Sequence, residues 1–352
     1  MRRFFSLLTI ILMLTCALSA CADSKSDING ESQSSRETER STSGGADSAE
    51  SNGGAESGGS AENSGSAESE GSSDTQKPEK ETQGSSESEE TEDTEKQYLR
   101  DGSYIYLGEY PQSLKKSNVT VGSTADSRGY YLGSDNCYYA KVTASPCQSG
   151  YRFSNDAIID SQSIYYFKVE PIKWRVVSES DGYATLLCES IIEGSRYDDA
   201  SNNYKDSEIR TYLNGTFLST AFAELEKEIL QTVTVDNSLS STGYTSNVNV
   251  CANTSDKVFL LSYSEAKSND YGLSSSSARI KAVSDYARAR GALISTIELG
   301  NNYGKGTWML RTPNDTYSHF IRACSYNGDI TDGGTHVSST FFGVAPAIKI
   351  KL

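Results

Sequence analysis

The stretch Ile164-Tyr-Tyr-Phe-Lys-Val-Glu-Pro-Ile-Lys-Trp-Arg-Val-Val177, together with Tyr183-Ala-Thr-Leu-Leu-Cys188 that follows it, decides the fold of this chain. Both runs are rich in aromatic and β-branched residues, as strands usually are. We predict strands at 164–169, 171–177 and 183–188. Asp181-Gly182 has the composition of a two-residue hairpin turn. The stretch is therefore predicted to form strands of a sheet, the last two joined by a tight turn.

Further strands are predicted on both sides of this stretch. Residues 139–142 could pair with 164–169 as a hairpin, and residues 103–108 alternate like a strand that ends at a turn over 108–112. Asp256–Leu261 is a candidate for a buried strand. The chain closes with three more predicted strands, at 307–310, 319–324 and 343–352.

Short helices interrupt the strands. Apolar spacing and end signals predict a helix at 207–213 that ends at Asn214-Gly215, and others at 221–230 and 285–291. In the second helix, Phe222, Leu225 and Ile229 are expected on one apolar stripe. Ser262-Tyr-Ser-Glu265 is a capping box, in which Ser and Glu satisfy each other's free amides. The mixture predicts the α+β class, in one domain at residues 97–352.

The segment at 21–96 has a different composition. From Ala22 to Lys96 there is no Phe, Trp or Tyr, and Ile28 is the only large aliphatic residue. Such a segment cannot bury enough apolar surface to offset the cost of ordering its backbone, so we expect a disordered linker. It holds 20 acidic and 6 basic residues, whereas 97–352 holds 27 acidic and 24 basic. The nearly neutral domain has no basic patch, which argues against a nucleic-acid partner.

Residues 1–20 have the parts of a secretory signal: Arg2 and Arg3, an apolar run, and small residues before Cys21. Leu18-Ser19-Ala20-Cys21 resembles the bacterial lipobox, which implies cleavage between Ala20 and Cys21 and a lipid, such as palmitate, on Cys21. A plain signal peptide or a membrane span are the alternatives, but the apolar run is short for a span of about 20 residues. We expect an extracytoplasmic protein that is lipid-anchored to the cell membrane and exposed at the surface.

A series of motifs resembles an uncharacterised domain family that is common in surface lipoproteins of gut-type bacteria and has no assigned activity. The motifs include Tyr-Pro-Gln, Pro-Ile-Lys-Trp-Arg-Val, Val-Phe-Leu-Leu-Ser, Trp-Met-Leu-Arg-Thr-Pro and Gly-Val-Ala-Pro-Ala, and they extend over residues 104–352. Ala345 replaces the usual Arg of the closing motif, and Met309 replaces a second Trp. The closing part also resembles C-type-lectin-like and formylglycine-generating-enzyme-like domains. That resemblance implies that the N- and C-terminal strands pair and that long loops form any binding face.

The cysteines give no clear catalytic or disulfide pattern. After Cys21, the chain contains an odd set of five, at positions 137, 147, 188, 251 and 324. A bridge between Cys137 and Cys147 is disfavoured, because ten extended residues span about 30 Å and a disulfide needs Cα atoms within about 7 Å. Cys188 and Cys324 lie in apolar strands, where a small buried hydrophobe is expected. His319 and His336 belong to no recognisable Cys/His signature.

No cofactor or metal is predicted. Loop carboxylates at Asp315, Asp329 and Asp332 have no spacing typical of a calcium site. Paired carboxylates for glycoside hydrolysis cannot be singled out among the acidic residues.

The candidate binding residues lie near the C-terminus. Tyr is abundant, with 22 in the chain against 10 Phe, and Tyr is favoured on recognition surfaces because it offers rigid contact area with a polar tip. Half-buried tyrosines in strands are the other explanation. Trp174 is expected in the core, and so is Trp308. The loop after Trp308 is the predicted ligand-binding face, formed by Arg311, Asn314, Asp315 and Tyr317, with Arg322.

We therefore expect a tethered binding or adhesion module for an extracellular glycan or protein. A cell-envelope enzyme with an unrecognised active site and a structural envelope protein with no small ligand are the alternatives. An exposed Tyr-rich loop face would favour binding, whereas a deep cleft with converging acidic, His or Cys side chains would favour an enzyme.

Overall fold

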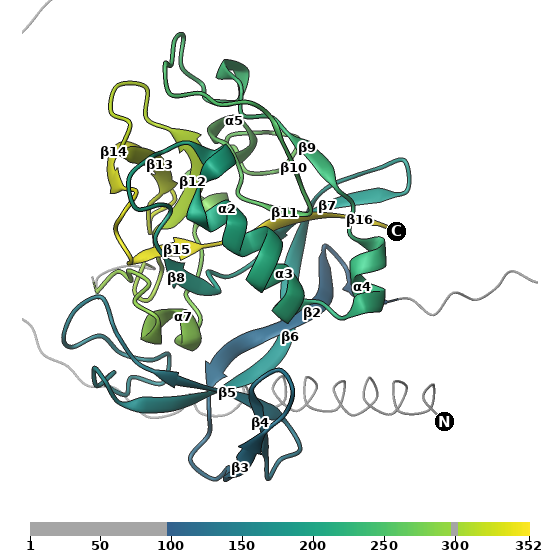
Figure 1. Cartoon of the computed structure of the whole chain (residues 1–352), viewed down its shortest axis with the longest axis vertical. Helices are drawn as coiled ribbons and strands as arrows, with labels where there is room; N and C mark the ends of the chain where they lie inside the picture. Colours follow the sequence, from purple (N-terminus) through teal and green to yellow (C-terminus); the bar gives the residue numbers. More distant parts are fainter. Residues whose placement is uncertain (1–96, 297–301) are drawn as a thin grey trace, which may run out of the picture. The chain divides into compact units, whose positions relative to one another are not determined.

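The computed structural model of the chain describes residues 97–296 and 302–352. The predicted leader, the lipidation site at Cys21 with its cleavage site after Ala20, and the linker to residue 96 lie outside the described residues. The described part is a mixed α+β domain, mostly strands with a few short helices (Figure 1). Among these residues, no helix has the length and apolar character needed to cross a membrane.

The larger sheet has nine strands in the order β11-β16-β7-β6-β5-β4-β3, with β2 beside β6 and β1 beside β2. The long strand β6 therefore lies at its centre. The strands are β1 (Leu99–Asp101), β2 (Tyr104–Leu114), β3 (Val121–Ala125), β4 (Tyr130–Gly133), β5 (Tyr138–Thr143), β6 (Ile164–Ser180), β7 (Tyr183–Cys188), β11 (Val258–Phe259) and β16 (Ala347–Lys351).

A five-stranded sheet has the order β14-β13-β12-β15-β8, and β9 and β10 form a two-stranded ribbon. In Figure 1 the five-stranded sheet lies on the left, away from the end of β16. Its strands and those of the ribbon are β8 (Glu193–Ser195), β12 (Trp308–Pro313), β13 (Phe320–Cys324), β14 (Ile330–His336), β15 (Phe342–Val344), β9 (Val233–Val235) and β10 (Thr254–Asp256).

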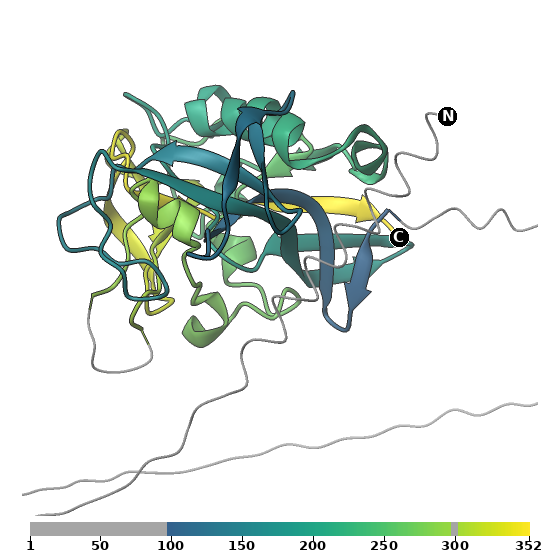
Figure 2. The ribbon, with the colours of Figure 1, turned by 90° about the horizontal axis from the view of Figure 1, so that it is seen from below.

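The helices are short, and α2, α3 and α4 lie together on one side of the long strands (Figure 2). The α-helices are α2 (Glu208–Tyr212), α3 (Leu218–Ala221), α4 (Glu224–Ile229), α5 (Tyr263–Ala266), α6 (Ser276–Arg279) and α7 (Asp285–Ala289). A π-helical turn η2 (Leu213–Phe217) joins α2 to α3, and 3-10 turns occur at η1 (Tyr204–Asp206) and η3 (Leu239–Ser241).

For the central stretch, the predicted hairpin turn at Asp181-Gly182 is confirmed, but the predicted division into two strands at 164–169 and 171–177 is wrong. Asp181 and Gly182 both have positive φ, 54° and 76°, as a type I′ hairpin turn requires. Residues 164–180 form one strand, however, not two. β5 pairs with β6 as far as Lys168 and β7 pairs from Trp174 onward, so β6 has only β2 beside it at Pro171. A proline is tolerated there because its missing N–H can face the unpaired side.

Two predicted boundaries are corrected. The first strand does not end at the turn expected over 108–112, because β2 continues through an irregularity at Gly108 (φ 68°) and pairs with β6 as far as Leu114. Asn214-Gly215 does not end the first helix, which continues through η2 and α3. The Asn214 side chain accepts from the backbone N–H of Lys257 and donates to the Val258 carbonyl. These hydrogen bonds tie the helical turn η2 to the strand β11.

The other helix predictions are confirmed in most respects. The capping box of Ser262 and Glu265 is present, and α7 lies within the predicted 285–291. The helix expected at 221–230 is shorter, at 224–229, and Phe222 is buried before it begins. Leu225 is 56% exposed, so the expected apolar stripe is incomplete.

The strand pairing implied by the lectin-like resemblance is wrong. The last strand, β16, lies between β11 and β7, while the first strands, β1 and β2, pair with each other and with β6. The two indole rings are in the core as expected, because Trp174 and Trp308 are both fully buried. Their N–H groups donate to the carbonyls of Leu107 and Arg279, so neither indole carries an unpaired polar group into the core.

Candidate ligand-binding site

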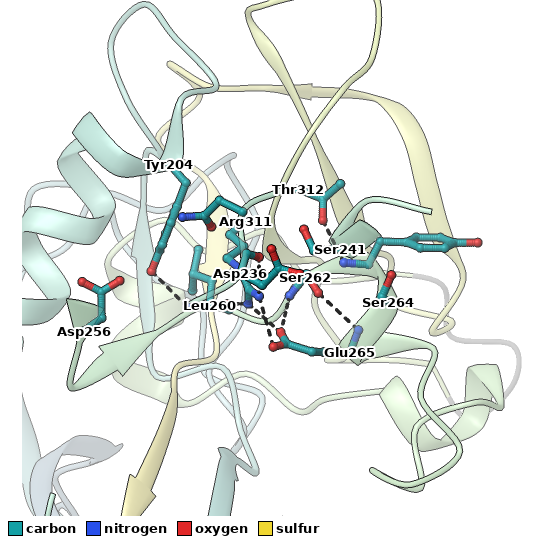
Figure 3. A network of polar contacts seen from close by, with 12 residues as sticks. Tyr204, Asp236, Ser241, Asp256, Leu260, Ser262, Ser264, Glu265, Arg311 and Thr312 are labelled. Carbon is teal, nitrogen blue, oxygen red and sulfur yellow. Dashed lines mark hydrogen bonds and ion pairs between the residues drawn. The ribbon is translucent and has the colours of Figure 1, made fainter. Parts of the chain in front are cut away.

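Arg311 lies inside the domain and not on a binding face. It is 2% exposed, and Figure 3 shows its guanidinium enclosed by protein groups. Nη1 donates to Glu265 and to the Leu260 carbonyl, and Nη2 donates to Glu265 and to the Asp236 carbonyl. The predicted ligand contact through Arg311 is therefore corrected, because its terminal donors are already occupied and the residue is buried.

Arg322 is also enclosed. It is 4% exposed and stacks between two rings, with its guanidinium carbon 3.9 Å from the Tyr244 centroid and 4.0 Å from the Tyr263 centroid. An Nη2 atom forms an ion pair with Asp332. These contacts give Arg322 a packing role between loop and sheet, which corrects the expectation of a ligand contact.

The loop after β12 keeps two accessible members of the predicted set. Asn314 is buried, and its side chain accepts from the backbone N–H groups of Thr316 and Tyr317, so it shapes the turn. Asp315 is half-buried, and Tyr317 is 57% exposed. The structure thus brings Asn314, Asp315 and Tyr317 together on one loop but leaves only the last two able to meet a ligand.

Cys188 and Cys324 are small buried side chains, as the sequence predicts. Cys188 and Cys324 are buried free thiols, and burial raises the pKa of each to about 12, so neither supplies a thiolate near neutral pH. Cys147 is a free thiol, so it is not bonded to Cys137. Within residues 97–296 and 302–352, no three His, Cys, Asp or Glu side chains group as a metal site would need.

A cavity of about 490 Å³ opens elsewhere, where β2, β4, β5 and β8 meet α2, η2, α3 and α7. Its volume lies within the roughly 300–1,000 Å³ that is typical of small-ligand sites. We call it the tyrosine cavity, after four of its lining residues. It is lined by Tyr110, Pro111, Gly129, Tyr130, Ala140, Lys141, Val142, Thr143, Glu193, Tyr212, Thr216, Thr220, Tyr286 and Arg290.

Glu193, on β8, is the buried carboxylate of the cavity, 3% exposed. Its Oε2 accepts from the hydroxyls of Tyr110 (2.9 Å) and Tyr212 (3.3 Å). Its Oε1 accepts from the backbone N–H of Gly194 (3.0 Å) and from Nε of Arg290 (3.1 Å). Four donors therefore satisfy both oxygens, which is what a buried charge requires.

Gly194 allows α7 to approach β8 closely enough for the Glu193–Arg290 pair to form. A Cβ atom at this position would lie 2.6 Å from the backbone nitrogen of Ala292 and 3.0 Å from the carbonyl oxygen of Arg290. Real Cβ atoms do not approach backbone atoms this closely, so only glycine fits here without a shift.

Tyr130 is one of the lining residues, and its hydroxyl group is buried. The residue is 5% exposed, and its Oη atom has no hydrogen-bond partner among residues 97–296 and 302–352. Leaving a buried hydroxyl unpaired costs roughly 1–3 kcal/mol, so such groups in native proteins call for an explanation such as an absent partner. Burial raises the pKa of Tyr130 to about 12, and the group stays a neutral donor.

The other tyrosines of the cavity are neutral donors too. Burial, followed by the charge of Glu193, raises the pKa values of Tyr110, Tyr212 and Tyr286 above their ordinary value. The charge of Glu193 also raises the pKa of Arg290, which stays cationic. A nucleophile or general base needs a pKa near the working pH, so these hydroxyls suit hydrogen bonding better than proton abstraction.

No local pattern in the sequence marks these cavity residues as a site. The abundance of Tyr gives no location, because the residues of the cavity lie between positions 110 and 290 and meet only in the fold. One local signal was available: Glu193 follows Ile191-Ile192, and a carboxylate in an apolar run implies a buried partner.

Comparison with known proteins assigns a domain to the C-terminal part of the chain. Residues 181–352, from β7 to β16, match the family described as Domain of unknown function (DUF6273). No curated protein and no solved structure matches the chain. Glu193, Tyr212, Tyr286 and Arg290 lie within the matched range, whereas Tyr110, Tyr130 and Lys141 precede it. Residues 181–352 are therefore similar to this family, and part of the cavity comes from the preceding strands.

Proposed function

We propose that this chain is a surface lipoprotein whose domain binds a small polar ligand, a glycan or a peptide, in the tyrosine cavity. The unpartnered hydroxyl of Tyr130 carries this proposal. A ligand oxygen placed opposite this hydroxyl would supply the missing acceptor and recover the energy that the free protein forgoes. The volume of the cavity and its mixture of aromatic rings with polar tips agree with a ligand of this kind.

A binding role is favoured over the alternative of an envelope enzyme. The tyrosine hydroxyls have raised pKa values and are therefore protonated at neutral pH. Glu193 already accepts four hydrogen bonds, so it has no lone pair directed at a substrate proton. Such a site holds a ligand by donors that are fixed in advance, which lowers the entropic cost of binding.

The tether in this proposal consists of Cys21 and the acidic linker to residue 96. Two or three acyl chains, at about 0.8 kcal/mol per buried methylene, hold stably in a membrane. Such an anchor would keep the binding domain attached to the membrane.

Binding is tested with the purified full chain on arrays of glycans and peptides. We expect selective binding that weakens about tenfold in Tyr130→Phe, which removes only the hydroxyl. Tyr131→Phe is the matched control, because Tyr131 is the neighbouring tyrosine of β4 and does not line the cavity. Binding that is equal in the two variants would place the ligand elsewhere and contradict the proposal.

The anchor is tested separately by metabolic labelling. Radiolabelled palmitate should enter the mature chain, and the Cys21→Ala variant should lose both the label and its retention in the membrane fraction. A variant that keeps the label, or that is retained like the wild type, would contradict lipidation at Cys21.

A further inference from the structure

In the tyrosine cavity, the acidic group has protein partners for both of its oxygens, whereas the basic groups keep free donors among the described residues. Both oxygens of Glu193 are occupied by protein donors. Its negative charge is therefore compensated inside the fold, and it offers no acceptor to a cationic ligand. A ligand entering the cavity meets the remaining charged groups, which are basic.

Arg290 has one occupied donor atom in the described part of the chain. Nε binds Glu193, while Nη1 and Nη2 make no hydrogen bond to any residue within 97–296 and 302–352. Its side chain is 49% exposed, so these two groups reach the open part of the cavity. The ion pair holds the guanidinium in place and leaves its terminal edge available. That edge matches a carboxylate, which can accept two parallel hydrogen bonds from it.

Lys141 contributes a second cation at the cavity wall. It is exposed, lies on β5, and forms no ion pair or hydrogen bond through Nζ in the part of the chain that the structure describes. The nearest acidic groups around Tyr130 are already paired, because Arg128 contacts both Glu109 (3.4 Å) and Asp126 (3.3 Å). The uncompensated charge that faces a ligand is therefore positive.

We propose, on the basis of the proposed function, that the ligand is an acidic saccharide. Its carboxylate would bind Nη1 and Nη2 of Arg290 with Lys141 beside them, and a ring oxygen or hydroxyl would accept from Tyr130. The rest of the lining fits a sugar, because it combines tyrosine rings with the hydroxyls of Thr143, Thr216 and Thr220.

The test compares sugars that differ only in charge. The full chain is titrated calorimetrically with oligosaccharides of galacturonate, glucuronate and sialic acid, and with the methyl esters of the same oligosaccharides. At least one acid should bind at least about tenfold more tightly than its ester. That preference should fall as salt is raised, because the Arg290 and Lys141 side chains are partly exposed to solvent.

A variant of each cation locates the effect. Lys141→Gln should weaken binding of the acid and leave the ester unchanged, whereas Lys267→Gln, at the exposed end of α5, should change neither. Arg290→Gln would leave the buried Glu193 without its cation, and this variant could fail to fold. The comparison of acid and ester on the wild-type protein is therefore the decisive measurement for Arg290.

The outcomes separate this inference from the proposed function. Esters or neutral sugars that bind as well as the acids, in a manner that needs Tyr130, would overturn the acidic ligand and leave the cavity as a saccharide site. Binding of acidic peptides with no saccharide binding would overturn the inference as well. Failure of every saccharide and peptide to bind in the cavity would overturn both.

Discussion

Glu265 and Arg311 form an ion pair inside the domain, with 2.5 Å between Oε2 and Nη1. The same Oε2 atom accepts from the backbone N–H of Ser262, which is the capping box at the start of α5. One carboxylate therefore joins the start of a helix to β12, and through Arg311 to the carbonyls of Leu260 and Asp236. Arg311 is nearly fully enclosed, so its charge depends on this partner.

Removal of the Glu265 carboxylate should destabilise the fold strongly. Glu265→Ala leaves a buried guanidinium without its counter-charge, and breaking such pairs costs about 3–5 kcal/mol. Glu265→Gln keeps an acceptor for the cap and should cost less. The free energy of unfolding is measured by urea denaturation. Glu208→Ala is the control, because Glu208 pairs with Arg196 on the surface (side chains 44% and 43% exposed) and should lose less than about 1 kcal/mol. Equal losses in Glu265→Ala and Glu208→Ala would contradict the assignment.

In the ligand-free protein, loss of the hydroxyl should change the stability of the fold differently at two tyrosines of the cavity. Tyr130→Phe removes an unpartnered buried hydroxyl and should leave stability unchanged or increase it. Tyr110→Phe removes a hydroxyl that contacts Glu193 and Tyr212, so the variant should lose about 1–3 kcal/mol. Thermal unfolding of the two variants beside the wild type checks this. A larger loss for Tyr130→Phe would mean that its hydroxyl has a partner in the free protein.

Gly194→Ala should destabilise the domain and disturb the cavity. The added Cβ meets the backbone of Ala292 at 2.6 Å, and overpacking of this kind costs about 1–3 kcal/mol. Gly215→Ala is the matched control, because a Cβ there meets nothing within 4 Å and lies in a helical turn. The control should be neutral or more stable by up to about 1 kcal/mol. Equal stability of the two variants would show that β8 and α7 can separate without cost.

The sequence predicted correctly those elements that depend on neighbouring residues alone. The positive φ values at Asp181 and Gly182 and the capping box at Ser262 depend on residues that are adjacent in sequence, and both were found where expected. The division of β6 at Pro171 was wrong because tolerance of that proline depends on which neighbours β6 has there. The helix end predicted at Asn214 was wrong for a similar reason. The Asn214 side chain binds the backbone of residues 257 and 258, which are distant in sequence, and the helix continues past it.

The candidate site was beyond prediction from local pattern. Arg311 and Arg322 are predicted on the ligand-binding face because they lie in or near the loop after Trp308, but the fold surrounds both. The cavity depends instead on Tyr130 and Glu193, which lie 63 positions apart and meet only when β4 and β8 face one space. Charge on the surface and charge in the core have the same sequence signature, and only the tertiary contacts separate them.

Lys281 should make stability depend on pH. Burial lowers its pKa from 10.5 to about 8, and its Nζ donates to the carbonyl of Cys188. The thiols of Cys188 and Cys324 act on it electrostatically, as do Glu189 and Arg175, which are paired with each other. Between about pH 8 and pH 10.5 the unfolded chain binds more protons at this lysine than the folded protein does. The free energy of unfolding therefore gains a contribution from Lys281 as pH rises through that window.

The Lys281→Met variant isolates this contribution, because the thiols and tyrosines titrate in both proteins. Near pH 7, wild-type Lys281 is charged both folded and unfolded, and the full penalty of about 3 kcal/mol acts on the folded state. Any stability advantage of Lys281→Met should therefore be largest near pH 7 and shrink by up to about 3 kcal/mol toward pH 10. Urea denaturation across this range measures the difference, with Lys267→Met, an exposed lysine, as the control whose difference should not vary with pH. A difference for Lys281→Met that is constant with pH would mean that this ammonium keeps its ordinary pKa, and that the carbonyls around it solvate the charge as well as water does.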